Sequence, residues 1–124
     1  MAQARGRATV AAATVLLLVV VQCGVSSAAT FKVGDEGGWV FGVQDWPNGK
    51  TFKDGDILEF NYTPGRHNVV VVDEKGYNEC KAASGATTFT TGKDQITLKK
   101  GKSFFLCGFP THCDNGMKLA ITVA

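Results

Sequence analysis

The chain has 124 residues, of which 44% are hydrophobic and 19% are charged, and this length suits one compact domain better than two. The formal net charge is +2, and the only basic cluster is Lys99, Lys100 and Lys102. Proteins that bind nucleic acid or anionic membranes usually carry a larger basic surplus, so charge argues against both kinds of partner.

The N-terminal segment has the three parts of a secretory signal peptide. Arg5 and Arg7 precede fourteen uncharged residues, and four small residues follow at 26–29. The apolar part is shorter than the roughly 20 residues of a membrane helix. We therefore expect residues 1–28 to be a signal peptide and residues 29–124 to form a secreted domain of the extracellular space or cell wall, without a membrane anchor.

Removing the first 28 of 124 residues leaves 96, and cleavage after Ala29 fits the small residues equally well. Both arginines of the leader are lost, so eleven basic and eleven acidic side chains remain and the net charge is zero. The mature chain keeps Cys80, Cys107 and Cys113 in an oxidising compartment, where disulfides persist. Because three is an odd number, one thiol pairs between chains, stays free or has another role.

The mature sequence predicts an all-β domain, because turn signals recur about every ten residues and no helical periodicity is sustained. In the clearest strand, Leu58, Phe60 and Tyr62 alternate with Glu59 and Asn61, which predicts one dry face and one wet face. The expected strands are, in chain order, 30–33, 57–62, 69–72, 95–98, 103–106 and 118–123.

Residues 73–92 form a long connection between two of these strands, with a helical turn expected around Tyr77 to Ala82. A connection of this length lets the chain cross from one sheet to the other, so we expect a Greek-key β-sandwich. Trp39 and Trp46 are expected to fill the core of such a domain.

A pattern of metal ligands lies near the C-terminus. Cys107, His112 and Met117 follow one another with four residues between each, just after one strand and just before another. The other histidine, His67, lies at the start of strand 69–72, so all four side chains can meet at one end of a sandwich. Two histidines and a cysteine with a weak axial methionine form the blue-copper site.

Each ligand type suits copper for its own reason. A cysteine thiolate is soft and binds copper strongly, imidazole suits both oxidation states, and a thioether is a weak donor that favours Cu(I). Zinc could use the same cysteine and histidines, but it prefers a harder fourth ligand or water. A copper oxidase would need further metal ligands, and the mature chain has no other histidine.

The three cysteines allow two interpretations. A Cys80–Cys113 disulfide would tie the long connection to the residue after His112, and its loop of about 33 residues would stabilise the fold by roughly 3 to 4 kcal/mol. A Cys107–Cys113 disulfide would instead remove the thiolate and destroy the metal site. The residues themselves leave both pairings open.

Several further stretches, together with the ligand pattern, resemble the phytocyanins over essentially the whole mature chain. They are Gly37-Gly38-Trp39, Trp46-Pro47, Phe52 with Gly55-Asp56, Phe60-Asn61-Tyr62, His67-Asn68-Val69, Asp94-Gln95-Ile96 and residues 107–117. The resemblance implies a cupredoxin β-sandwich, a Cys80–Cys113 disulfide, and His67, Cys107, His112 and Met117 as copper ligands. Methionine in the axial place differs from the phytocyanins that use glutamine.

The resemblance implies a small monomeric one-electron carrier with type 1 copper, and not an enzyme. Its partner would be a transient redox protein or a small-molecule reductant or oxidant, with His112 as the exposed edge for electrons between Phe109 and Pro110. The alternative is a secreted cell-wall or signalling module, active in reproductive-tissue guidance, in which copper is secondary. Asn61-Tyr62-Thr63 is in addition a sequon for N-glycosylation, followed by Pro64.

Overall fold

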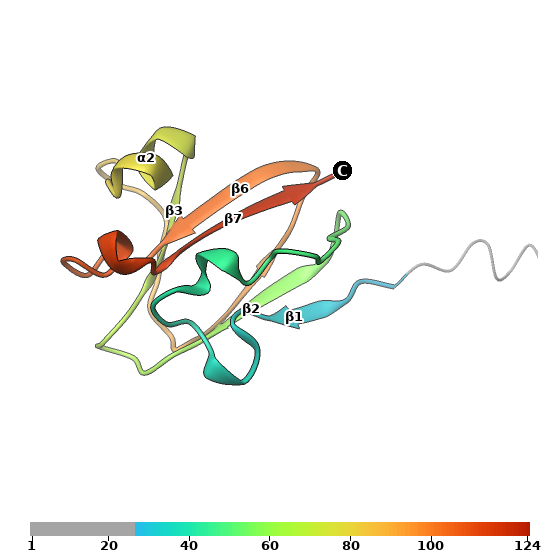
Figure 1. Ribbon diagram of the computed structural model, residues 1–124, viewed down its shortest axis with the longest axis horizontal. Coiled ribbons are helices and arrows are strands. Elements are labelled where there is room, and N and C mark those ends of the chain that lie inside the picture. Colours follow the sequence, from blue (N-terminus) through green and yellow to red (C-terminus); the bar gives the residue numbers. More distant parts are fainter. Residues whose placement is uncertain (1–26) are drawn as a thin grey trace, which may run out of the picture.

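The computed structural model describes residues 27–124, so the predicted signal peptide lies almost entirely outside the described residues. Two sheets face each other around one core (Figure 1). The first sheet has the strand order β1-β2-β5 and the second has the order β4-β3-β6-β7. The strands are β1 (Thr30–Lys32), β2 (Ile57–Asn61), β3 (Val69–Val72), β4 (Thr88–Phe89), β5 (Lys93–Thr97), β6 (Gly101–Leu106) and β7 (Lys118–Val123).

The strand pairing confirms the predicted β-sandwich. The strand β1 runs parallel to β2, and every other pair of neighbours is antiparallel. The chain changes sheet between β2 and β3, between β4 and β5, and again between β5 and β6. All six predicted strands are present, and the short strand β4, inside the predicted connection 73–92, is the one that sequence reasoning missed.

Aromatic side chains fill the space between the sheets. Trp39 and Phe60 are fully buried and meet edge to face, with ring centroids 5.0 Å apart. The Phe105 ring also packs against Phe60, with the ring centroids 5.3 Å apart. The expectation for Trp39 is confirmed, whereas Trp46 is only partly buried at the margin of this core.

The face of β2 that was predicted to be exposed to solvent is more buried than its sequence suggests. Glu59 is only 6% exposed, although its alternation places it opposite Leu58 and Phe60. The amides of Asn61 and Gln95 each donate a hydrogen bond of 3.0 Å to its carboxylate. These hydrogen bonds replace the water that the carboxylate loses, so burial of a charge on this face is tolerated.

The helix α2 (Glu74–Glu79) covers the outer face of the second sheet (Figure 1). It begins three residues before the predicted helical turn, because the Asp73 carboxylate accepts a hydrogen bond of 2.7 Å from the Gly76 amide and caps the helix. Beside α2, Val70, Leu106 and Cys113 form a second, smaller core. This cluster packs the sheet from outside at the end where Cys107 follows β6.

Residues 33–56 connect β1 to β2 without a strand, apart from a single bridge between Phe52 and Val123. This connection contains the short 3-10 helices η1 (Asp35–Gly37) and η2 (Val43–Asp45), and a third, η3 (Cys113–Asn115), lies before β7. None of the helices in the described part of the chain has the length and apolar character needed to cross a bilayer.

Candidate metal centre

Three of the four predicted ligands converge on one point. The Nδ1 atoms of His67 and His112 lie 3.2 Å apart, and the Cys107 sulfur lies 3.4 Å from His112 Nδ1 and 3.9 Å from His67 Nδ1. His67 is 40 residues from Cys107 and 45 residues from His112 in the sequence, so the fold brings two distant segments together here. Sequence reasoning placed these side chains at one end of the sandwich, and the structure brings them together there.

The triangle of donor atoms has the size of a metal site. A point equidistant from three atoms at these separations lies about 2 Å from each, which is the usual length of a bond from imidazole nitrogen to a first-row metal ion. Two soft or borderline nitrogens and one sulfur form the donor set of a trigonal copper site. The residues therefore fit copper.

Two of these ligands lie at the ends of strands, and His112 lies in the loop directly before η3. His67 lies two residues before β3, and Cys107 follows the last residue of β6. The strands β3 and β6 are paired neighbours in the second sheet. The Cys107 amide donates a hydrogen bond of 3.1 Å to the Met117 carbonyl, which continues the pairing of β6 with β7 past their ends. Cys107 is therefore placed by the most extended ladder of the fold.

The loop from Cys107 to Met117 is closed by its own backbone. The Met117 amide donates to the His112 carbonyl at 3.1 Å, so that residues 112 and 117 are locked across η3. Thr111 has a φ of 67°, a left-handed conformation that reverses the chain just before His112. Met117 itself is fully buried in the same core as Cys107, as an axial ligand inside the protein would be.

Asn68 braces the site and was not assigned a role from the sequence. Its Oδ1 accepts a hydrogen bond of 2.6 Å from the Gly108 amide, and its carbonyl accepts one of 2.8 Å from the Trp39 indole. A side chain at position 108 would place a Cβ 3.3 Å from Asn68 Oδ1 and 3.1 Å from Val70. The only sequence signal was the position of Asn68, between His67 and a buried strand.

Burial favours the neutral, metal-binding form of the first histidine. The pKa of His67 is lowered by desolvation first, and then by the neighbouring His112 and Arg66. All three effects disfavour the imidazolium, which has no lone pair for a metal on either nitrogen. Cys107 is 1% exposed, and it is the only unpaired cysteine among the described residues.

The disulfide joins Cys80 to Cys113, with the Cα atoms 5.6 Å apart. This confirms the pairing that the phytocyanin resemblance implies, and it excludes the competing pairing of Cys107 with Cys113. The bridge links the C-terminal end of α2 to η3, immediately after His112. The metal-binding loop is therefore fastened to the outer layer of the second sheet.

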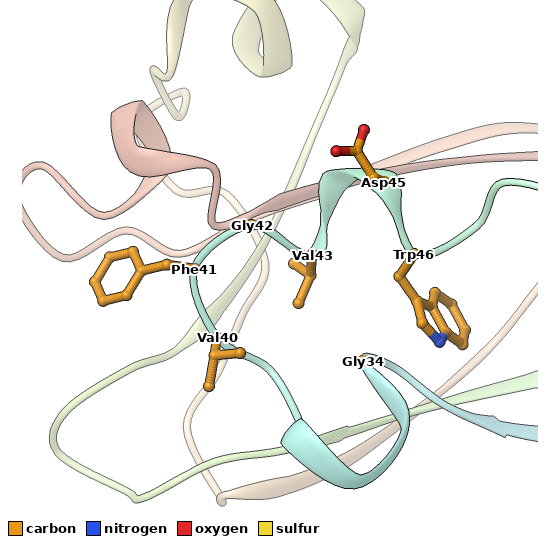
Figure 2. Close-up of a pocket in the computed structure, with 7 residues that line it drawn as sticks. All are labelled: Gly34, Val40, Phe41, Gly42, Val43, Asp45 and Trp46. Atoms are coloured by element: carbon orange, nitrogen blue, oxygen red, sulfur yellow. The ribbon is translucent and has the colours of Figure 1, made fainter.

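Aromatic rings surround the histidines at the surface. The Phe109 ring stacks on His112 at 5.7 Å with an interplanar angle of 17°, and the Phe41 ring meets it edge to face at 5.0 Å. Phe41 is 50% exposed, and sequence reasoning did not identify it. Figure 2 shows that Phe41 and Trp46 project in opposite directions from the connection between β1 and β2. Both residues line a surface hollow of about 400 Å³.

A second hollow, of about 430 Å³, lies directly over the ligands. Both histidines form part of its wall, together with Phe41, Phe109 and the Gly65-Arg66 turn. His112 is half-buried and Pro110 is exposed, so His112 reaches the surface beside Pro110. The Cys107 sulfur is therefore buried, whereas the rings of His67 and His112 are accessible from the hollow.

Comparison with known proteins agrees with this geometry. Residues 39–117 match the family model described as a plastocyanin-like domain, over more than half of the chain. The chain is 52% identical to the basic blue protein of Arabidopsis thaliana over 96% of its own length and 90% of that protein. The chain belongs to the phytocyanin family. This confirms the resemblance that the sequence motifs suggested, and with it the cupredoxin fold.

Two further relatives support this assignment. This phytocyanin is 45% identical to chemocyanin of Lilium longiflorum over the whole of both chains. It superimposes on the solved structure of cucumber basic protein, a blue copper protein, with a TM-score of 0.76 and 51% identity, covering 77% of this chain and all of that one. Copper is therefore its cofactor, as predicted, and the zinc alternative is discarded.

Proposed function

We propose that this phytocyanin is an extracellular one-electron carrier in which His67, Cys107, His112 and Met117 hold a type 1 copper ion. The single observation that supports this most strongly is the convergence of the two Nδ1 atoms and the Cys107 sulfur within 3.9 Å of one another. Family membership supports an electron-carrying role, since phytocyanins are copper electron-transfer proteins rather than catalysts.

Copper in such a site supplies a Cu(II)/Cu(I) couple, whose potential depends on the axial ligand and on the surroundings of the cysteine sulfur. The chain contributes a rigid frame. Cys107 and Met117 are joined by a backbone hydrogen bond, and Asn68 holds the Gly108 amide that follows the thiolate. Ligands fixed in this way would move little when the oxidation state of a bound copper ion changes. The reorganisation energy of electron transfer is then small.

We infer that electrons pass through the hollow over the histidines. The rings of Phe41, Phe109 and His112 form a weakly polar surface there, and Arg66 adds a positive charge at its edge. Transient redox complexes use small contact areas of this kind. The partner is accordingly a redox protein that docks briefly, or a small reductant or oxidant, and the carrier works as a monomer.

We further propose that the protein is secreted with residues 1–28 removed. The charged start, apolar centre and small residues at 26–29 support this. Phytocyanins are extracellular proteins. Glycosylation at Asn61 stays a prediction. In the unmodified chain, the Asn61 Nδ2 donates a hydrogen bond to Glu59.

The decisive experiment is a visible absorption spectrum of the purified protein with one equivalent of Cu(II), before and after reduction. The native chain should show the intense absorption of a copper–thiolate bond and lose it on reduction. Cys107→Ser should lack that absorption completely, because serine oxygen cannot replace the thiolate. An intense band that persists in Cys107→Ser would contradict thiolate ligation.

The same variant separates the carrier from the alternative role as a signalling or cell-wall module. In a cell-guidance assay, a carrier requires its copper, so Cys107→Ser should be inactive while remaining folded by circular dichroism. Full guidance activity of a copper-free variant would instead favour the signalling role.

A further inference from the structure

Asp56 is a buried carboxylate at the corner where the domain begins. It is 3% exposed, and its two oxygens accept hydrogen bonds from backbone amides, Oδ1 from Ala29 at 3.0 Å and Oδ2 from Lys53 at 2.8 Å. These two hydrogen bonds are the main causes that lower the pKa of Asp56, the one from Ala29 first, while the charge of Lys53 is the weakest cause. Within the described residues, this buried anion therefore relies on neutral donors.

Ala29 is fixed from two directions. Its amide donates to Asp56, and its carbonyl accepts a hydrogen bond of 2.9 Å from the Ile57 amide. The parallel pairing of β1 with β2 then begins at the next residue, with Thr30 opposite Ile57. Ala28, in contrast, is exposed and outside any strand or helix. The contacts of the first strand thus start at Ala29.

We propose that the α-ammonium group of Ala29, released by hydrolysis of the Ala28–Ala29 peptide bond, is the counter-ion of Asp56. The inference rests on the proposed removal of residues 1–28. Hydrolysis consumes one water, leaves a carboxylate on Ala28, and gives Ala29 an amine that takes up a proton at neutral pH, since such groups have pKa values of about 7.7 to 8.0. The nitrogen already lies 3.0 Å from Oδ1, so the ion pair forms without any rearrangement.

This pairing distinguishes the two cleavage sites that fit the sequence. Cleavage after Ala29 would remove both the donor to Asp56 and the acceptor for the Ile57 amide, and leave a buried carboxylate with fewer partners. Cleavage after Ala28 keeps both hydrogen bonds and makes the first one charge-assisted, which strengthens it. Maturation at Ala28 therefore stabilises the domain, and maturation one residue later weakens it.

The pair has a pH dependence of defined sign. A carboxylate partner raises the pKa of the ammonium in the folded protein, so its contribution is fully present below about pH 7.7 and is lost as the pH rises through the folded pKa. The other charged groups of this corner are Lys53 and Asp54, which precede Asp56, and Lys100, whose amide donates to Asp54.

The test uses the full chain secreted from eukaryotic cells and loaded with copper. The N-terminus of the product is read by intact mass and N-terminal sequencing. A second chain carries Gly-Ser inserted between Ala28 and Ala29, which moves the ammonium away from Asp56 and leaves the amide of Ala29 in place. Both chains are also made with Asp56→Asn, and with Glu36→Gln as a control that removes an exposed carboxylate elsewhere.

The expected product begins at Ala29 and unfolds about 5 °C higher at pH 7 than the inserted chain. This difference should shrink as the pH rises from 7 to 9.5, vanish in Asp56→Asn, and persist in Glu36→Gln. A product that begins at Thr30 would overturn the proposed cleavage site, and one that keeps residues 1–28 would overturn the signal peptide itself. A product that begins at Ala29 but melts with the inserted chain at pH 7 would overturn the ion pair alone.

Discussion

At the scale of single residues, the axial position is the place where this chain differs from phytocyanins that use glutamine. Met117 is fully buried, and its backbone hydrogen bonds to Cys107 and His112 fix its position independently of any metal. A substitution of its side chain should therefore change the metal without dismantling the loop. This separation makes position 117 a clean test of ligand chemistry.

Met117→Gln should keep the blue colour and lower the reduction potential. An amide oxygen is a harder donor than a thioether and stabilises Cu(II) relative to Cu(I), whereas the thiolate that causes the colour is untouched. The measurement is cyclic voltammetry at pH 7, with Met117→Leu as the control that supplies no axial donor and should raise the potential. Equal potentials for all three proteins would show that Met117 is not a ligand.

A second prediction at this scale concerns the charge beside the histidines. Arg66 is exposed, lines the hollow over the ligands, and acts on His67 through its charge. Arg66→Glu should slow reduction by the anion ferrocyanide by about tenfold at low ionic strength, because the local potential changes sign. The matched control is Lys100→Glu, which makes the same charge change before the start of β6, at the opposite end of that strand from Cys107.

Stopped-flow rates for both variants would be compared at low salt and near 1 M salt. At 1 M salt the Debye length is only about 3 Å, so the charge at position 66 is screened and Arg66→Glu should react at the native rate. If Lys100→Glu slowed the reaction as much as Arg66→Glu, electrons would not enter beside His67.

At the scale of elements, the disulfide fastens η3 to the end of α2. Cys80 has a φ of 53° at the C-cap of α2, and Cys113 is the first residue of η3, so the bridge joins the end of one helix to the start of another. Lys118 adds a second link, because its ammonium lies over the Tyr77 ring and donates to the Tyr77 carbonyl. The two links hold α2 against the strands that carry the ligands.

Replacing both Cys80 and Cys113 by alanine should lower the free energy of unfolding by about 3 to 4 kcal/mol, since the bridge closes a loop of 33 residues. Chemical denaturation of the copper-free protein measures this loss. Copper affinity should fall as well, because η3 follows His112 directly. Lys118→Met, which removes only the charge link to α2, is the control and should cost far less; an equal loss would mean that the bridge does not restrain the loop.

The strands were predictable because their signals are local. The alternation in β7 predicts its buried side chains, and Leu119, Ile121 and Val123 are indeed buried. Glu59 could not be predicted to be buried from β2 alone, because the Gln95 amide that compensates it comes from another strand. The same limit applied to β4, which has two residues and exists only through its pairing with β3.

The three ligands that converge could be predicted from the sequence, but the surroundings of the site could not. Four ligand residues in one ordered pattern identify a blue-copper centre, since their chemistry is specific in combination. Phe41 and Asn68 carry no such chemical signature. Phe41 reaches His112 from a connection without strands, and Asn68 acts through hydrogen bonds to Gly108 and Trp39. Contacts of this kind depend on how distant segments fold together.

At the scale of the whole molecule, acid stability depends on two buried carboxylates whose pKa values are lowered by hydrogen bonds, Glu59 on β2 and Asp56 directly before that strand. The pKa of Glu59 is lowered by hydrogen bonds from Asn61 and then Gln95, and the pKa of Asp56 by backbone amides. A folded pKa below the unfolded value stabilises the fold above the unfolded pKa, about 3.9 for aspartate and 4.3 for glutamate. This stability is lost as the pH falls through the folded pKa values.

The copper-free protein should therefore lose stability as the pH falls below about 4, and Glu59→Gln should flatten part of that dependence. Glutamine stays neutral at every pH, so the variant is less stable than the native chain at pH 7 and approaches it at pH 3. Urea unfolding from pH 7 to 3 measures this, and the copper-free form is required because acid also protonates the histidine ligands. Glu79→Gln, at an exposed position on α2, is the matched control and should follow the native curve. A constant offset between Glu59→Gln and the native chain over the whole range would mean that ionisation of Glu59 does not contribute to the stability of the fold.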